Sequence, residues 1–185
     1  MNANIYYEHG VSDSHIDAAV LATQTMGNLV NRSTAINVQS LDIELPELQT
    51  GQVDSSFIDR VHVDESTSAL FVMNRDLGVV GLNYVFGSSA FERRVAIVSS
   101  SRVDEISMFG LVLHESGHME GVVDEGSPQY DRVSQFAGHC ANTCVMQPVN
   151  NIDDMKATAE KVISCPHSAG FCNMCSADLI NAQSK

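Results

Sequence analysis

The five residues 114–118, which read His-Glu-Ser-Gly-His, constrain this chain more than any other segment. Residues four apart share one face of a helix, so two imidazoles at this spacing can bind one metal ion if the segment is helical. The flanking sequence favours a helix over 101–118, with Ser101 and Asp104 as a start signal and a repeating apolar stripe. Gly121 follows, where a left-handed residue commonly ends a helix. We therefore predict a helix that presents His114 and His118 on one face.

This residue pattern is chemically suited to zinc and to proton transfer. Two imidazoles at this spacing can coordinate Zn²⁺, and zinc lowers the pKa of a bound water toward about 7. Glu115 lies one residue after the first histidine, so its carboxylate can reach such a water rather than the metal. Two solvated histidines on a surface helix are the plain alternative. We interpret Glu115 as a candidate general base beside a zinc site.

Four cysteines near the C-terminus form a second metal-binding pattern. They are two close pairs, separated by 27 residues: Cys140 with Cys144, and Cys172 with Cys175. Structural zinc prefers four thiolates, and each close pair supplies two corners of a tetrahedron. Disulfides or buried apolar cysteines are the alternatives. The remaining cysteine, Cys165, is expected to be a free thiol.

Composition excludes several classes of protein. The 185 residues include 23 Asp and Glu against 10 Lys and Arg, a net charge of −13, which argues against binding to nucleic acid. The longest apolar run, 69–73, is far shorter than a membrane span. Residues 1–8 lack the pattern of a secretory signal, so we expect a cytoplasmic protein, and a monomer.

Apolar patterning predicts an α+β fold with a mixed, mostly parallel sheet and packed helices. A helix is expected over 16–30 and a second over 54–68. Strands are expected at 5–7, 36–45, 69–73, 78–87 and 95–98. We interpret 1–185 as one domain with two lobes: a layered lobe to about residue 121, and a small irregular lobe over about 122–185 that is held together by zinc.

The motifs together resemble those of a known family. The histidine pattern extends through Gly121 to H-E-x-x-H-x-x-G, and a His-Cys step, a further Cys, a Met and a late C-x-x-C follow. This order is similar to the archaemetzincins, which are zinc-dependent metalloproteases of the metzincin clan with a zincin-like fold. The similarity covers roughly residues 70–178, including the segments 82–87 and 95–100 before the predicted helix.

The resemblance implies two zinc ions per chain. It implies His114, His118 and His139 as ligands of a catalytic zinc, with Glu115 as general base, Cys140, Cys144, Cys172 and Cys175 as ligands of a structural zinc, and Met146 as the Met-turn. This sequence departs from the family pattern because 17 residues, 122–138, separate Gly121 from His139. Asp124 occupies the usual register of the third ligand, whereas His139 has the expected cysteine neighbour. We favour His139 and interpret 122–138 as an inserted loop.

The expected function is therefore hydrolysis of peptide bonds in a peptide or protein substrate. The substrate would lie along an edge strand at 95–99, and Tyr130 in the inserted loop could serve as an additional donor. One alternative is a zinc-stabilised binding or regulatory protein whose first site does not turn over substrate. Another is a thermolysin-like site with Glu125 or Glu160 as third ligand.

Overall fold

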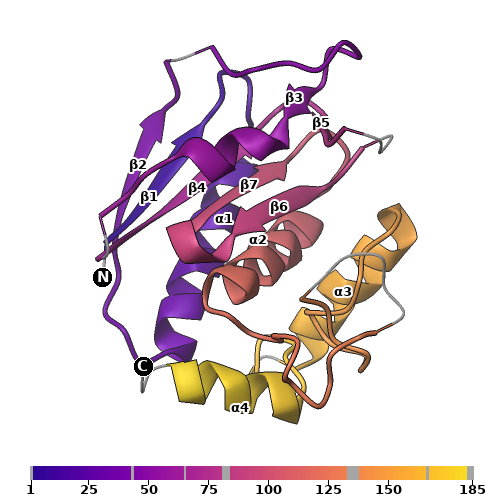
Figure 1. Cartoon of the computed structure of the whole chain (residues 1–185). Helices are drawn as coiled ribbons and strands as arrows, with labels where there is room; N and C mark the ends of the chain where they lie inside the picture. The colour runs from indigo at the N-terminus through magenta and orange to yellow at the C-terminus, as the bar shows by residue number, and fades with distance from the viewer. Residues whose placement is uncertain are drawn as a thin grey trace.

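The computed structural model describes residues 2–42, 44–64, 66–80, 84–132, 138–165 and 167–182. Its main sheet has five strands in the order β2-β1-β4-β7-β6 (Figure 1). These strands are β1 (Asn2–Tyr7), β2 (Ala35–Ser40), β4 (Thr67–Met73), β6 (Gly87–Ala90) and β7 (Val95–Ser99). All neighbouring pairs are parallel except β6 with β7, which is antiparallel. The predicted mixed, mostly parallel sheet is confirmed.

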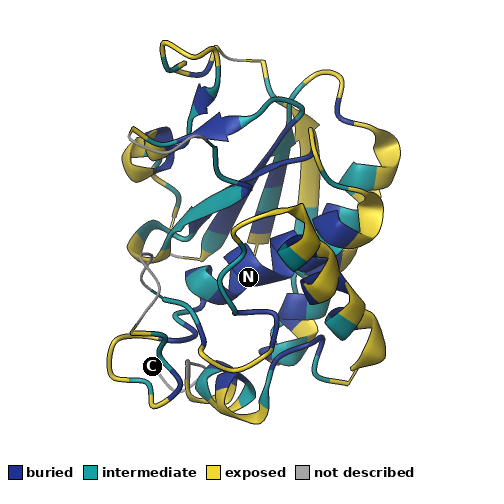
Figure 2. Cartoon of the chain, turned by 90° about the vertical axis from the view of Figure 1, so that its right-hand side faces the viewer, coloured by how far each residue is buried: buried dark blue, intermediate teal, exposed yellow. Residues whose placement is uncertain are grey.

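Both faces of this sheet are covered. Leu70 and Val72 of β4 pack with the helices α1 (Asp13–Leu29) and α2 (Glu105–Met119). The alternate residues of β4, including Phe71, pack on the opposite face against the short 3₁₀ helix η1 (Ser55–Arg60) and its flanking segments. Strands β4 and β7 are almost wholly buried, as Figure 2 shows in dark blue. Burial on both faces explains their unbroken apolar runs.

Helix α2 crosses the interior beside the sheet and carries the His-Glu-Ser-Gly-His segment. Its N-cap is Asp104, whose carboxylate accepts a 2.8 Å hydrogen bond from the backbone N–H of Ser107. The predicted helix is therefore confirmed, but it begins after Asp104 rather than at Ser101. It ends as expected before Gly121, which has a φ of 71° that glycine adopts without strain.

The chain after α2 begins with turns and bends and ends with two helices, α3 (Ile152–Ser164) and α4 (Asn173–Ala182) (Figure 1). The sequence interpretation of this region as irregular missed both helices. Asn151 caps α3, and Met155 and Ala159 are buried on its inner face. Part of the predicted inserted loop, 133–137, lies outside the described residues.

Four further expectations need correction. The strand predicted over 78–87 is not formed as such, since β5 (Leu77–Gly78) ends at its start, β6 begins at its end, and 81–83 lie outside the described residues. β5 pairs instead with the two-residue β3 (Val53–Asp54) in a separate small sheet. The helix predicted over 54–68 is only the short η1. The strand predicted over 36–45 ends at Ser40.

The fourth correction concerns the edge of the sheet. β7 lies between β4 and β6, so it cannot accept a further strand, and β6 is the edge on that side. A second 3₁₀ helix, η2 (Phe91–Arg93), joins β6 to β7. Within the described ranges, no helix combines the length and apolar character needed to cross a bilayer.

Candidate metal centres and the cleft around them

Three histidines meet at one point beside α2. His114 and His118 lie on the second half of that helix, and His139 approaches from the segment that follows the inserted loop. The ring centroids are 4.7 Å apart for His114 and His118, and 5.2 Å and 5.1 Å from each of them to His139. One ring nitrogen from each lies within 4.8 Å of those of the others. The structure thus brings together all three histidines of the predicted site.

The geometry of the histidine group suits a tetrahedral zinc ion. The Nε2 atoms of His114 and His118 are 3.1 Å apart. Two nitrogens bound to one zinc at the usual bond length would be about 3.3 Å apart. The Nδ1 atom of His114 is 2.7 Å from the carbonyl oxygen of Val145, which can only accept, so Nδ1 carries the proton and Nε2 keeps its lone pair for a metal.

Burial keeps the rings of His114 and His118 neutral. It lowers the pKa of His114 to about 4, helped by the nearby His139 ring, and it lowers the pKa of His118 well below its ordinary value. Neutral imidazole is the form that binds metals, so protonation does not compete with a cation at neutral pH. His114 and His118 are therefore in the form that binds a metal ion at neutral pH.

The alternative third ligands lie elsewhere. The Asp124 carboxylate accepts hydrogen bonds from the backbone N–H of Gly126 at 2.9 Å and from the Ser127 hydroxyl at 3.2 Å. Asp124, Glu125 and Glu160 are exposed and are not members of the group that the three histidines form. Spacing after Gly121 would make Asp124 the third ligand. The tertiary structure instead brings His139 beside the helix.

Glu115 is buried between α2 and strand β6. Its side chain points at the strand, where Ser89 hydrogen-bonds to the carboxyl group, and burial raises the pKa of Glu115 to about 8. A Cβ atom at Gly87 would lie only 2.5 Å from Glu115 Oε1, so the carboxyl group fits only because that position is glycine. A divalent cation beside it would favour the ionised form. Neither Gly87 nor Ser89 was among the predicted site residues, because no local pattern marks them.

Met146 packs against α2 at Gly117, which lies between His114 and His118 in the sequence. It is fully buried, and a Cβ atom at Gly117 would lie 2.4 Å from its sulfur. The carbonyl oxygen of Met146 accepts a 2.8 Å hydrogen bond from the backbone N–H of Cys140. Gly117 therefore allows the turn that holds Met146 to approach the helix closely.

The four predicted cysteines also meet. The Sγ atoms of Cys140 and Cys172 are 3.9 Å apart, and those of Cys144 and Cys175 are 3.8 Å apart. These distances exclude disulfides, whose sulfurs are about 2.05 Å apart, and they match the roughly 3.8 Å between two thiolates on one tetrahedral zinc. Burial raises the pKa of Cys140 to about 12, so binding of a cation must release protons. Cys165 is exposed and is not part of the group.

The histidine group and the cysteine group share one segment of the chain, which backbone hydrogen bonds hold in place. His139 and Cys140 are neighbours in sequence, and the carbonyl oxygen of His139 accepts from the backbone N–H of Asp131 at 2.7 Å. The N–H of Ala141 donates to the carbonyl oxygen of Gln129 at 2.8 Å. These bonds tie the middle of the segment 122–138 to the residues on either side of Cys140. A metal ion held by the cysteines would therefore also restrain that histidine.

A cleft opens on both sides of the histidines. One hollow, of about 410 Å³, is lined by His114, His118, His139 and Glu115 and by the strand β6, with apolar side chains such as Tyr84 and Phe86. A larger hollow, of about 1010 Å³, continues past His118 and includes Tyr130 in its wall. The candidate centre therefore lies where the two hollows meet, since His118 lines both.

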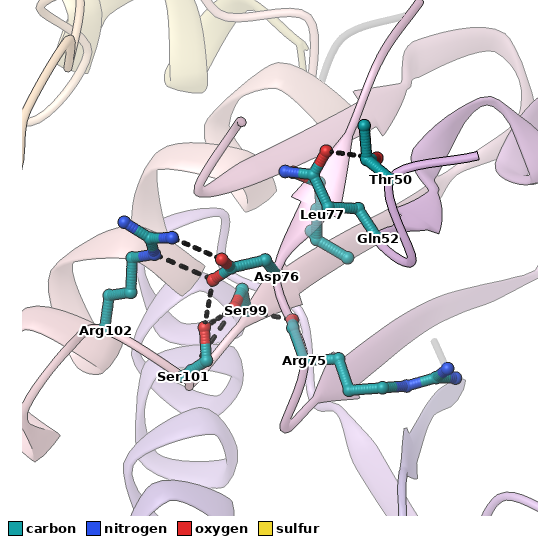
Figure 3. Close-up of polar contacts among 8 residues, drawn as sticks. All are labelled: Thr50, Gln52, Arg75, Asp76, Leu77, Ser99, Ser101 and Arg102. Atoms are coloured by element: carbon teal, nitrogen blue, oxygen red, sulfur yellow. Dashed lines mark hydrogen bonds and ion pairs between the residues drawn. The ribbon is translucent and has the colours of Figure 1, made fainter. Parts of the chain in front are cut away.

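A polar network around Asp76, Ser101 and Arg102 (Figure 3) lies next to Tyr84, which lines the smaller hollow. Arg102 binds the Asp76 carboxylate through two guanidinium nitrogens, with Nε at 2.8 Å, and Ser101 donates to the same carboxylate. These contacts lower the pKa of Asp76. The Arg102 guanidinium also lies 4.7 Å from the centre of the Tyr84 ring. The network thus holds Tyr84 at the cleft.

Solved structures share this fold over the whole chain. An archaemetzincin from Methanopyrus kandleri matches 100% of this chain and 96% of its own at 19% identity and a TM-score of 0.76. An archaemetzincin from Archaeoglobus fulgidus, complexed with malonate, matches 96% of this chain and 99% of its own at 20% identity and a TM-score of 0.70. A zinc-dependent peptidase from Methanocorpusculum labreanum matches 96% and 99% at 15% identity and a TM-score of 0.62.

Comparison with protein-family models gives no match, and neither does comparison with curated proteins. The likeness is therefore one of three-dimensional structure, and it shows that this chain has the fold of the archaemetzincins. It confirms the fold expected from the sequence.

Proposed function

We propose that this chain is a zinc-dependent metallopeptidase. The observation that carries the proposal is the convergence of three ring nitrogens within 4.8 Å of one another, beside a buried glutamate and at the junction of two hollows. The fold shared with two archaemetzincins and a zinc-dependent peptidase supports it. The residues present fit zinc, since neutral imidazoles at this separation are its ordinary ligands.

In this proposal His114, His118 and His139 hold the catalytic ion, and the four cysteines hold a structural one. A zinc ion in the first position would supply a Lewis acid for the scissile carbonyl and lower the pKa of a bound water. Met146 would form the Met-turn, supporting the helix from beneath. The whole chain would act as one catalytic unit, with the cysteine-bound lobe fastened to the helix-bearing lobe.

Glu115 would act as the proton carrier. Its carboxylate would take a proton from the attacking water and deliver it to the leaving amine. Contact with Gly87 and the hydrogen bond from Ser89 hold the group in one orientation, so little reorganisation is needed.

The substrate would bind as an extended peptide along β6. This strand is the edge of the sheet, and its residues Gly87–Ser89 line the smaller hollow beside Glu115. An edge strand presents main-chain donors and acceptors to which an extended peptide can add. From the sequence we expected the substrate to lie along 95–99, but this strand, β7, lies inside the sheet, so β6 takes its place in the proposal.

The test compares the parent protein with Glu115→Gln, using a library of unstructured peptides and metal analysis of both proteins. We expect two zinc ions per chain in each, and a loss of turnover of about 10³-fold or more in the variant. Equal cleavage by both proteins would contradict the role of Glu115. Two zinc ions with no cleavage by the parent would instead favour a zinc-stabilised binding protein.

A further inference from the structure

A carboxylate at the C-terminal end of α2 joins three segments of the chain. Glu120 follows the last helical residue, and its side chain is only 6% exposed. Its Oε2 atom is 2.8 Å from Nη1 of Arg32, and its Oε1 atom is 2.7 Å from Nη2 of Arg94. Both guanidiniums are partly buried. One arginine follows α1, and the other belongs to the connection between β6 and β7.

The main chain of Arg94 is fixed in the sheet. This residue has a φ of 54° and lies between η2 and the first residue of β7. Its carbonyl oxygen accepts a 3.0 Å hydrogen bond from the N–H of Ala69, and its own N–H donates to the carbonyl oxygen of Phe91 at 3.1 Å. The ion pair with Glu120 therefore links the end of α2 to the point where the β6–β7 hairpin turns.

The same hairpin also contacts α2 and the glycine that follows it. The Phe91 ring packs on Gly121, where a Cβ atom would lie 2.7 Å from the ring. At the start of β6, Gly87 contacts the Glu115 carboxyl group, and Ser89, two residues further on, hydrogen-bonds to it. Strand β6 thus contacts α2 through Gly87 and Ser89, and Phe91, which follows the strand, contacts Gly121 just after the helix; Gly87–Ser89 also border the smaller hollow.

We propose that the ion pair between Arg94 and Glu120 is a positioning contact that holds the edge strand β6 against α2. β6 has four residues and pairs with one neighbouring strand, so the sheet alone restrains it weakly. An ion pair with a buried carboxylate is directional and resists displacement of the hairpin. The consequence for peptide binding rests on the function proposed above.

The second arginine provides a matched control. Arg32 binds the other oxygen of the same carboxylate, and its own backbone N–H donates to the carbonyl oxygen of Gly27 at the end of α1. Arg32→Gln and Arg94→Gln therefore each remove one guanidinium from Glu120. Arg94 belongs to the β6–β7 connection, whereas Arg32 follows α1. A general loss of stability would appear in both variants. A loss of the position of β6 would appear in Arg94→Gln alone.

Amide hydrogen exchange measures the positioning directly, without any need for catalysis. We expect residues 87–90 to exchange about tenfold faster or more in Arg94→Gln than in Arg32→Gln, because local opening of the hairpin becomes easier. Arg94→Lys, which keeps a cationic donor, should lie between the parent and Arg94→Gln. Equal exchange of 87–90 in the two glutamine variants would overturn the proposal.

Steady-state kinetics test the consequence for substrate. With a peptide long enough to pair along β6, we expect Arg94→Gln to raise KM about five- to tenfold and to change kcat less than twofold. We expect Arg32→Gln to keep the parent KM within twofold. An unchanged KM in Arg94→Gln would overturn the role in substrate binding. A parent protein without Glu115-dependent turnover would overturn the proposed function instead, and the exchange comparison would still decide the role of the ion pair.

Discussion

Replacing Gly87 by alanine tests how closely the edge strand and the candidate base are fitted together. A Cβ atom there would lie 2.5 Å from Oε1 of Glu115 and 2.9 Å from both Cδ and Cγ. Ordinary contacts between such atoms are about 3.5 Å, so the new methyl group would be roughly 1 Å too close. The contacted atoms are the end of a flexible side chain, so the carboxyl group should move rather than the backbone.

A displacement of this size is large for a catalytic group. A shift of about 1 Å can lower the rate by about 10²-fold, so we expect Gly87→Ala to reduce kcat by roughly that factor. Zinc content should stay at the parent value, because the three histidines are untouched. The assay is steady-state peptide hydrolysis, with metal analysis and thermal unfolding on the same preparations.

Gly110→Ala is the matched control. A Cβ atom at that position of α2 would lie 3.4 Å or more from its nearest neighbours in Ala159, which is ordinary contact. The change should keep kcat within about threefold and add up to about 1 kcal/mol of helix stability. If Gly87→Ala cleaves peptides as fast as Gly110→Ala, the idea that β6 orients Glu115 is wrong.

Three further tests, which use four substitutions, address other parts of the structure. His139→Ala should lose one zinc ion while Asp124→Ala keeps both, as metal analysis will show; the reverse pattern would make Asp124 the third ligand. Cys172→Ser should lose the structural ion and lower the unfolding temperature by several degrees, because a structural zinc contributes directly to folding; an unchanged metal content would contradict the four-cysteine site. Asp104→Ala should cost about 1 kcal/mol of unfolding free energy at pH 7 through loss of the N-cap. The folded-state pKa of Asp104 is lowered by its hydrogen bonds to Ser107, so this contribution is present above the ordinary carboxyl pKa and is lost as pH falls through the lowered value. The difference in unfolding free energy between the parent and Asp104→Ala, measured by urea unfolding, should therefore be smaller in acid than at pH 7. An equal difference at both pH values would contradict the role of Asp104 as N-cap.

The sequence was sufficient where one local pattern allows few structures. The spacing of His114 and His118 requires a helix if both are to share a ligand, and the structure has one there. The apolar runs in β4 and β7 predicted strands covered on both faces, because an exposed face would leave such residues in water. The two close cysteine pairs predicted a single cluster, and the four thiols do meet.

Other features were harder to read because tertiary contacts determine them. The apolar stretch at 78–87 has the composition of a strand, yet its described part contributes only the end of β5, an isolated bridge at Val85 and the start of β6. The roles of Gly87 and Ser89 depend on the distance of this edge from α2, which no local pattern encodes. Sequence spacing could not decide whether His139 or Asp124 is the third ligand, because 17 residues separate Gly121 from His139.

Helix α3 was missed although its signal was present. Met155, Ala159 and Val162 follow the three- and four-residue steps of a buried helical stripe, and Asn151 precedes them as a cap. The surrounding Gly, Ser, Asn and Asp residues suggested an irregular segment instead. A hydrophobic pattern of three positions was outweighed by composition, which carries less information about local structure.

Anomalous diffraction at the zinc absorption edge is the most direct test of the two metal centres. We expect one peak about 2.0–2.1 Å from a ring nitrogen of each of His114, His118 and His139, and a second about 2.3 Å from each of the four cysteine sulfurs. A peak bound by His114 and His118 but not His139, or the lack of any peak between the histidines in zinc-saturated crystals, would contradict the account.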